Sequence, residues 1–305
     1  MATSDLPIGV GNSDAQTRFI RDHEPFLREH PRIHLLLTKI FIRQLAHPSE
    51  AEIEDLPDND PAVVAFENKV IANRLVFYLG RTAADDFSEL LILSGNGYGV
   101  GALKILRGMY ERIVTATYIA KNPSEARVFA EDDAVKKWKL WQEYVTVMPE
   151  LKARYTEDQV RELEERYKAV RAKRKEEICP KCGQPKTQEA WTRVTMPDMA
   201  KRADIGLAEI CGSCYLEPTF HSHATAYGIG TRLRETEEGA HTFNETTEPE
   251  ARRAVLLGHN LILRLLGLQS EYFGLGLEAE IRDRVSMFPK IWGSGTEAAR
   301  NNERA

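Results

Sequence analysis

Apolar residues along this chain recur mainly every three or four positions, a spacing that places them on one face of an α-helix. The pattern predicts helices over about 13–29, 31–47, 61–93, 99–121, 123–148, 157–177, 247–273 and 277–288. Alternation of the kind found in strands never continues beyond about four residues. We therefore expect an all-α protein, organised as a multi-helix bundle.

Helix start and stop signals divide the chain into four parts. Residues 1–47 are predicted to form an N-terminal helical hairpin, with Pro31 at the start of its second helix. Residues 48–60 form a linker that contains six acidic residues and no basic one. A helical core domain is predicted over 61–292, and residues 293–305 form a tail. An acidic run of this kind is usually a solvated segment.

Two apolar stripes predict a long helical hairpin over 123–177. Each stripe steps by three and four residues, and their members are Val135, Trp138, Trp141, Val145 and Met148, then Val160, Leu163, Tyr167 and Val170. A short connection joins the stripes, so the two helices should pack antiparallel. We interpret the tryptophan-rich stripe as core, with an exposed stacking platform as the alternative.

Composition and charge exclude several classes of protein. Hydrophobic residues make up 42% and charged residues 29% of the 305 residues, which is a normal globular balance. The net charge of -5 argues against a globally basic nucleic-acid binder. The apolar stretch 254–268 is too short to span a bilayer, and the first residues lack the pattern of a signal peptide. We expect a soluble, cytoplasmic protein with no membrane contact.

The four cysteines form two pairs with the same spacing, Cys179 with Cys182 and Cys211 with Cys214. Two thiolates separated by two residues can bind one tetrahedral metal ion, and four thiolates close its coordination sphere. The sequence therefore predicts a structural zinc knuckle inserted over 178–216. Two reduced, unligated pairs are one alternative, and a redox centre is another.

A basic run precedes and overlaps the first cysteine pair. Eight basic and two acidic residues between Arg166 and Lys186 give this segment a charge of +6, which leaves -11 for the rest of the chain. Within it, Arg174 and Lys175 are candidate contacts for a phosphate-bearing substrate. The alternative interpretation is a solvated helix face with ion pairs four residues apart.

Residues 199–210 have some features of a helix-turn-helix unit, which would make the chain a DNA-binding regulator. Asp204, however, occupies the position where a turn glycine is expected. The second helix of such a unit would carry the cysteine pair assigned above to a metal.

One helix carries a polar group among apolar neighbours. Arg107 and Glu111 are one turn apart and can pair, and Tyr110 lies between them as a candidate substrate contact. His221 and His223 follow the second cysteine pair, at a corner that Pro218 is expected to break. An arginine that holds an anion, with a carboxylate or imidazole that moves a proton, can act on a phosphodiester or another ester. A structural ion pair with hydrogen-bonded histidines is the alternative.

The segments around these residues resemble a bacterial family known only as a domain of unknown function. The resemblance rests on Arg107-Gly-Met-Tyr110-Glu111, Tyr118, Asn122-Pro123, Ala126 to Phe129, Trp191 and Thr219-Phe-His221-Ser-His223, and it covers roughly residues 65–275. The family pattern is an Arg-x-x-x-Glu helix followed by Ser-x-x-x-His. Here Thr219 stands for the serine, and two histidines compete for the last position. The resemblance implies no activity.

A looser similarity connects the chain with HEPN-type helical ribonucleases, whose signature is an arginine, four to six residues, and a histidine, paired across a dimer. Arg252 and Arg253 have this spacing from His259 within a predicted helix.

Three hypotheses follow. The first is an RNA- or nucleotide-directed toxin or defence effector that uses Arg107, Glu111, His221 and His223, and a homodimer with facing histidines would favour it. The second is a non-catalytic adaptor that binds a protein partner. The third is the DNA-binding regulator.

Overall fold

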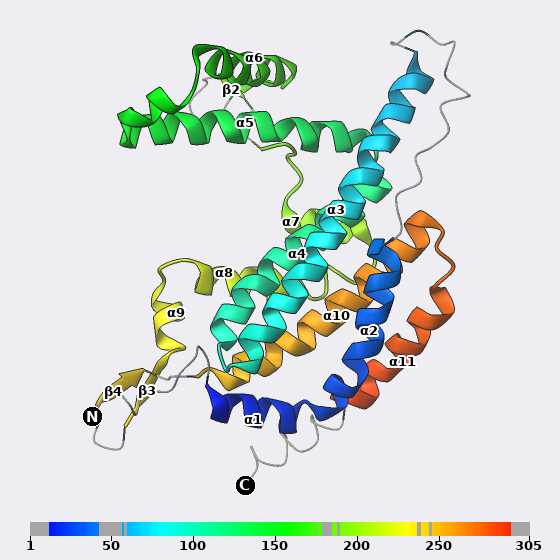
Figure 1. The fold of residues 1–305 in the computed structure, drawn as a ribbon, viewed down its shortest axis with the longest axis vertical. Coiled ribbons are helices and arrows are strands. Elements are labelled where there is room, and N and C mark those ends of the chain that lie inside the picture. The colour runs from blue at the N-terminus through cyan, green and yellow to red at the C-terminus, as the bar shows by residue number, and fades with distance from the viewer. Residues whose placement is uncertain are drawn as a thin grey trace. The chain divides into compact units, whose positions relative to one another are not determined.

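A computed structural model describes residues 12–42, 57, 60–174, 176–178, 185–187, 190–236, 239–243 and 246–293. The predicted acidic linker lies almost wholly outside these residues, as do the tail beyond Gly293, Lys175, Cys179 and Cys182. The described chain is almost entirely helical, which confirms the all-α prediction (Figure 1). None of its described helices combines the length and apolar character needed to cross a membrane.

The chain forms two compact units. Unit 1 comprises Met1–Leu45, Val76–Tyr118 and Met199–Ala305, and unit 2 comprises Ala46–Leu75 and Ile119–Asp198. The helices that belong wholly or largely to unit 1 are α1 (Ser13–Asp22), α2 (Glu24–Ile42), α3 (Pro61–Gly95), α4 (Gly99–Lys121), α7 (Met196–Ala203), η3 (Gly212–Leu216), α8 (Glu217–Ser222), α9 (Ala226–Gly230), α10 (Glu248–Phe273) and α11 (Glu278–Trp292).

Helices α4 and α10 supply much of the core of unit 1. Leu106 and Ile113 of α4 and Leu261 of α10 have no accessible surface. Gly80 lies within α3 and does not interrupt the helix. Its lack of a side chain lets Gln269 approach closely, and the amide of Gln269 donates to the Val76 carbonyl at 2.9 Å. Glycine is therefore used here for close helix packing.

The N-terminal segment differs from its prediction. The helix expected over 13–29 ends at Asp22, and α2 begins at Glu24 and continues through Pro31. Burial explains the break: the ring of His23 is 6% exposed, and both its amide and its Nδ1 lie 3.0 Å from the Phe19 carbonyl. The turn is thus decided by tertiary contacts that local spacing does not reveal.

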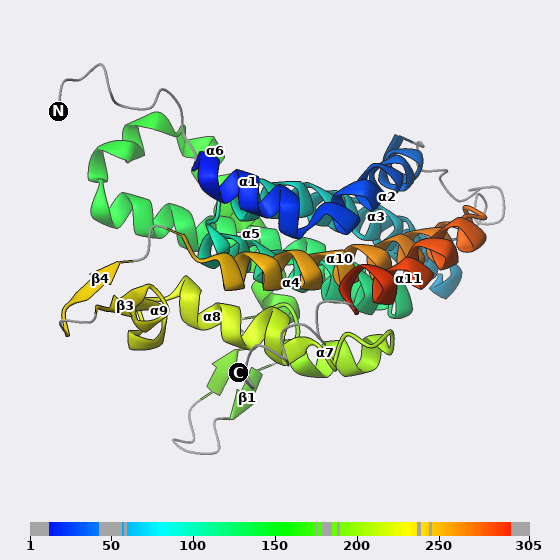
Figure 2. The same ribbon diagram turned by 90° about the horizontal axis from the view of Figure 1, so that it is seen from below.

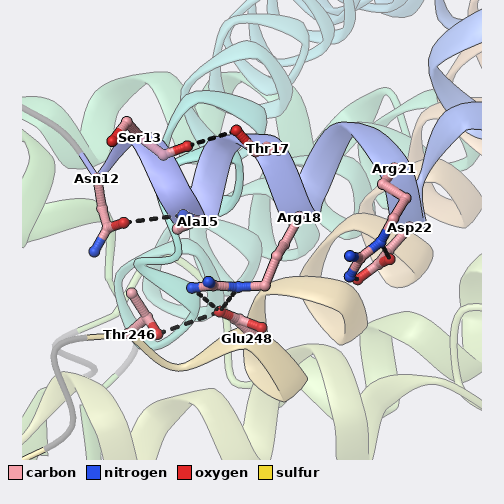
Figure 3. A network of polar contacts seen from close by, with 9 residues as sticks. All are labelled: Asn12, Ser13, Ala15, Thr17, Arg18, Arg21, Asp22, Thr246 and Glu248. Atoms are coloured by element: carbon pink, nitrogen blue, oxygen red, sulfur yellow. Dashed lines mark hydrogen bonds and ion pairs between the residues drawn. The ribbon is translucent and has the colours of Figure 1, made fainter.

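Figure 3 shows how α1 is held at its start. The side-chain oxygen of Asn12 accepts from the Ala15 amide at 2.9 Å and caps the helix. Further along α1, Arg18 binds Glu248 in the first turn of α10 at 2.7 Å. Both side chains are about two-fifths exposed, so this ion pair contributes little to stability.

Unit 2 contains the predicted helical hairpin. Its helices are α5 (Ser124–Val147) and α6 (Glu157–Lys173), joined by the short helix η2 (Pro149–Arg154), and they run side by side in Figure 1. Trp138 stacks on Tyr167 at 5.7 Å, and Lys173 binds Glu131 at 2.7 Å, a register that requires antiparallel helices. Thr156 and Gln159 form a capping box at the start of α6.

Helix α6 is shorter than predicted because two strands follow it. Strand β1 (Glu176–Ile178) pairs antiparallel with β2 (Pro185–Thr187), and Ile178 lies opposite Pro185. The two strands flank the Cys179–Cys182 motif in the sequence. The segment between α8 and α10 contains α9 and a second short antiparallel pair, β3 (Leu233–Glu235) with β4 (His241–Phe243).

The segment before His221 is continuous, which corrects the predicted break at Pro218. The chain passes from η3, which is a π-helix, directly into α8, and Pro218 lies in the first turn of α8. A proline is tolerated in a first turn because it has no amide to donate there. The π-helical bond runs from the Glu217 amide to the Gly212 carbonyl.

Candidate functional site

The site is built on α4, α8 and α10 of unit 1. The starts of α4 and α10 are tied together, since the Val100 amide donates to the Thr247 hydroxyl at 3.0 Å and the Thr247 amide donates to the Gly97 carbonyl at 2.8 Å. Gly99 has no room for a side chain: a Cβ would lie 2.1 Å from the Thr247 carbonyl oxygen. The glycine-rich loop before α4 therefore serves close helix packing.

Helix α8 lies beside α4 and α10 (Figures 1 and 2). Tyr215 of η3 stacks on Tyr110, and four residues later Thr219 of α8 contacts Arg107, nearer the start of α4. Residues later in the α8 segment therefore contact residues earlier in α4, so the two helices run antiparallel. This arrangement brings together the two segments that carry the family resemblance.

Arg107 is the centre of these contacts. Its Nη2 binds Glu111 at 2.8 Å, as the one-turn spacing predicted, and its Nε donates to the Thr219 hydroxyl at 3.0 Å. The guanidinium carbon lies 5.1 Å from the centre of the Tyr215 ring, in reach of a cation–π interaction. The Thr219 hydroxyl in turn donates to the Tyr215 carbonyl at 2.6 Å.

The two histidines of the motif have different environments. His221 is 5% exposed, and its buried Nδ1 has no hydrogen-bond partner among the described residues. His223 is exposed and stands at the end of α8 in extended conformation. Among the described residues, neither imidazole is hydrogen-bonded or ion-paired with Glu111. The structure therefore brings Arg107, Glu111 and Thr219 into contact, and it does not join either histidine to this group by a hydrogen bond or ion pair among the described residues.

Burial lowers the pKa of His221 below its ordinary value. The carboxylates of Glu217 and Glu250 oppose this shift, and the cations Lys104 and Arg232 add to it. The imidazole is consequently neutral at pH 7 and able to accept a proton.

A second ion pair lies on the other side of α8 and was not foreseen from the sequence. Arg253 of α10 binds both carboxylate oxygens of Glu217, and the Tyr227 hydroxyl donates to the same carboxylate at 3.1 Å. The hydrogen bonds from Arg253 and Tyr227 hold the pKa of Glu217 below its usual value, against the opposing effect of burial. The partners are 36 residues apart in the chain, so no local spacing could have paired them.

Two of the residues predicted to contact a substrate are placed elsewhere. Tyr110 has no accessible surface and donates to the Leu207 carbonyl at 2.9 Å, which does not agree with direct contact to a ligand. Arg174 lies in unit 2, where its side chain is 6% exposed and ion-paired with the buried Asp132. A guanidinium in that position holds α6 against α5.

The HEPN-like pairing is not formed within the described chain. His259 is fully buried, and its Nδ1 accepts from the Trp292 indole at 3.0 Å. Arg253 instead binds Glu217. It precedes His259 by six residues, so the two side chains lie on different faces of α10.

The described cysteines lie on the inner side of the segment that precedes α8. Cys211 and Cys214 are 6% and 0% exposed, and their thiols are free. The described residues contain no cluster of three or more side chains suited to hold a metal. Because the other two cysteines are outside the described residues, the four-thiolate site stays a prediction.

The segment expected to resemble a helix-turn-helix has only part of that geometry. Asp204, at the position of the turn glycine, does adopt a left-handed conformation with φ of 51°. Beyond the turn, Leu207, Cys211 and Cys214 are buried, and the chain enters the π-helix rather than an exposed second helix. The face that would read DNA is thus largely used for packing.

Comparison with known proteins gives one match. No curated protein and no solved structure matches the chain. A family model matches residues 74–241, which include Arg107, Glu111, Thr219 and both histidines, and span more than half of the chain. The chain therefore belongs to the family of unknown function DUF5677.

Proposed function

We propose that this protein acts on a phosphate ester of RNA or a nucleotide at the face formed by α4, α8 and α10. The observation that carries the proposal is His221, a buried imidazole that burial keeps neutral, whose Nδ1 has no hydrogen-bond partner among the described residues, and which is under the influence of the carboxylates Glu217 and Glu250 as well as the cations Lys104 and Arg232. A neutral imidazole is suited to take up a proton, and neighbouring cations are suited to attract a phosphate.

Arg107 is suited to hold the phosphate. Its Nε and Nη2 are fixed by Thr219 and Glu111, whereas its Nη1 has no hydrogen-bond partner among the described residues. A guanidinium fixed along one edge keeps donors on another edge in a defined direction. The side chain is 27% exposed, so a ligand can reach it.

In RNA cleavage, the imidazole of His221 would take the proton of the ribose 2′-hydroxyl as the 2′-oxygen attacks phosphorus. The bond from phosphorus to the 5′-oxygen then breaks, and that oxygen leaves with a proton. Arg107 would stabilise the negative charge that grows on the phosphate oxygens. His223, exposed at the end of α8, is the second candidate for supplying the proton to the leaving oxygen.

The test is cleavage of RNA and nucleotides by the purified protein, together with growth of cells that express it. His221→Asn preserves size without a titratable group and should lower activity about 100-fold or more. His241→Asn, at an exposed histidine of β4, should leave activity unchanged. Full activity in His221→Asn, or no cleavage by the parent protein, would contradict the proposal.

We also propose that the two cysteine pairs hold one structural zinc ion. Two observations support this zinc site. Two paired strands flank the Cys179–Cys182 motif in the sequence, and Cys211 and Cys214 are buried. Four thiolates leave no open coordination position, so the role would be structural. Freshly purified protein should contain close to one zinc per chain, and Cys179→Ser should lower both zinc content and the melting temperature. A zinc content near zero in the parent protein would overturn this part.

A further inference from the structure

The helical hairpin of unit 2 contains a cavity that plays no part in the site described above. Its volume is about 390 Å³, within the range of about 300–1,000 Å³ typical of small-molecule sites. The residues that line it come from both helices and from their connection: Lys137, Leu140, Trp141, Tyr144, Tyr155, Gln159, Val160, Glu162, Leu163 and Arg166.

The hairpin does not use this surface for its own core. Helix α6 and η2 have no buried residue, and α5 has none after Trp138. Leu140, Tyr144 and Tyr155 are between 45% and 50% exposed. Large apolar side chains gathered around a cavity and left in water are typical of a binding surface.

Aromatic rings form one wall of the cavity. Trp141 stacks on Trp138 with ring centres 5.1 Å apart and planes at 21°, and Trp138 stacks on Tyr167 at 5.7 Å and 23°. The stack ends at Trp141, which lines the cavity together with Tyr144 and Tyr155. A planar base placed in the cavity would therefore meet aromatic side chains, which bind bases with little regard to their identity.

One end of the cavity is cationic. Lys137 and Arg166 each precede a member of the Trp138–Tyr167 pair by one residue, so they lie at the same level of the hairpin. Both cations remain accessible to a ligand although each has a carboxylate neighbour. Arg166 is 3.9 Å from Glu162, and the side chains of Lys137 and its partner Asp133 are both more than half exposed. Exposed pairs of this kind are readily exchanged for a phosphate.

From this combination we propose that the cavity binds one nucleotide, with the base against the aromatic wall and the phosphate between Lys137 and Arg166. The nucleotide is either free or part of a single-stranded RNA. An amphipathic helix or a second copy of the chain would need a longer apolar groove and would have no use for cations confined to one end. The site is separate from His221 and does not depend on the proposed function.

The experiment is a titration of the full chain with AMP and UMP, followed by tryptophan fluorescence and calorimetry. Adenosine and inorganic phosphate serve as partial probes, and an eight-nucleotide RNA distinguishes the two sources of the ligand. AMP should bind at least ten times more tightly than either partial probe. A further large gain for the RNA would identify a strand as the ligand, and equal affinity would identify the free nucleotide.

Two variants test the two ends of the cavity. Arg166→Glu should weaken AMP binding at least tenfold, whereas Lys168→Glu, two residues away on the same helix and outside the cavity, should change it less than twofold. Tyr144→Ser should also weaken binding about tenfold, with Tyr78→Ser on α3 as its control. His221→Asn should leave AMP binding at this site unchanged, which separates this test from that of the proposed function.

Two results would overturn the proposal. One is AMP and RNA binding that is absent at millimolar concentration or insensitive to both Arg166→Glu and Tyr144→Ser. The other is a dimer in light scattering that Leu140→Glu converts to monomer, because a second copy would then occupy the cavity.

Discussion

Helices α10 and α6 are both long and amphipathic, yet they differ in how many of their residues are buried. Thirteen of the 26 residues of α10 are buried, whereas none of the 17 residues of α6 is. Helix α10 packs against α11 and α2 and is tied to α4 at its start, whereas the main packing partner of α6 among the described elements is α5. The sequence already indicates part of this difference, since α10 contains the apolar stretch 254–268 whereas the apolar residues of α6 recur only every three or four positions. Periodicity alone does not show how many neighbours cover a helix.

The difference indicates that the apolar side chains of the two helices have different roles, in folding for α10 and in ligand binding for α6. In α10, apolar side chains contribute to folding. In α6, Val160 and Leu163 remain near the surface of a cavity, where their apolar area is available to a ligand. Four predictions test this separation, and they follow in order of decreasing effect.

Trp138→Ala should have the largest effect, a loss of about 3–5 kcal/mol in the unfolding free energy of unit 2. Trp138 is 8% exposed and is the last buried residue of α5, so it is the main anchor of the hairpin. Chemical denaturation monitored by circular dichroism measures the loss. Trp141→Ala, at a partly exposed ring, should cost less. Equal costs would show that the hairpin has no single anchor.

Leu261→Ala in α10 should cost about 2–5 kcal/mol, since the side chain has no accessible surface and its removal leaves a cavity. The matched change Leu163→Ala in α6 should cost less than about 1 kcal/mol, because solvent replaces the lost side chain. Thermal melts of both variants decide the comparison directly. Similar losses would mean that α6 is covered by something in solution.

Acid should destabilise unit 1 through His259. Burial lowers the pKa of His259 from 6.5 to about 4, so the unfolded chain binds a proton that the folded chain rejects. The stabilising effect is complete above pH 6.5 and disappears as the pH falls towards 4, a total of about 3 kcal/mol. Unfolding at several pH values should show a steeper loss in the parent protein than in His259→Gln. Parallel curves would contradict this assignment.

Glu111→Ala should have the smallest effect on stability, about 1 kcal/mol or less. Both partners of the Arg107–Glu111 pair are about one-third exposed or slightly less, so Arg107 remains hydrated when the carboxylate is removed. A loss of about 3–5 kcal/mol would be expected only if the arginine were left buried without a partner. Calorimetry on the variant therefore decides whether this pair acts as part of the core or as part of an accessible site.

Local signals in the sequence predict the long helices well. The bounds expected for α4 match the structure, and the capping box of α6 forms as its residues indicate. Two features were not predicted. The break at His23 depends on the burial of that residue, and the continuous helix at Pro218 depends on the π-helix before it. Local rules describe hydrogen bonds within about four residues, and these features depend on partners outside that range.

In the candidate site, too, some contacts follow from local spacing and others from the tertiary arrangement. The pairing of Arg107 with Glu111 follows from their one-turn spacing, and the contact of Arg107 with Thr219 agrees with the family pattern. The pairing of Arg253 with Glu217 and the burial of Tyr110 follow from the tertiary arrangement alone. The cavity on the hairpin could have been suspected from the stacking-platform interpretation of its tryptophans, although Trp138 itself is core.

The π-helix before α8 has a consequence for how this chain can change during evolution. A π-helical turn contains one residue more than an α-helical turn, and one residue corresponds to about 100° of rotation. Loss of a single codon at 215 or 216, just after the buried cysteines, would therefore turn Thr219 and Glu217 away from Arg107 and Arg253 while the cysteines stayed in place. Substitutions in this segment should be tolerated far more often than single-residue deletions, and sequences descended from this one should keep its length unchanged.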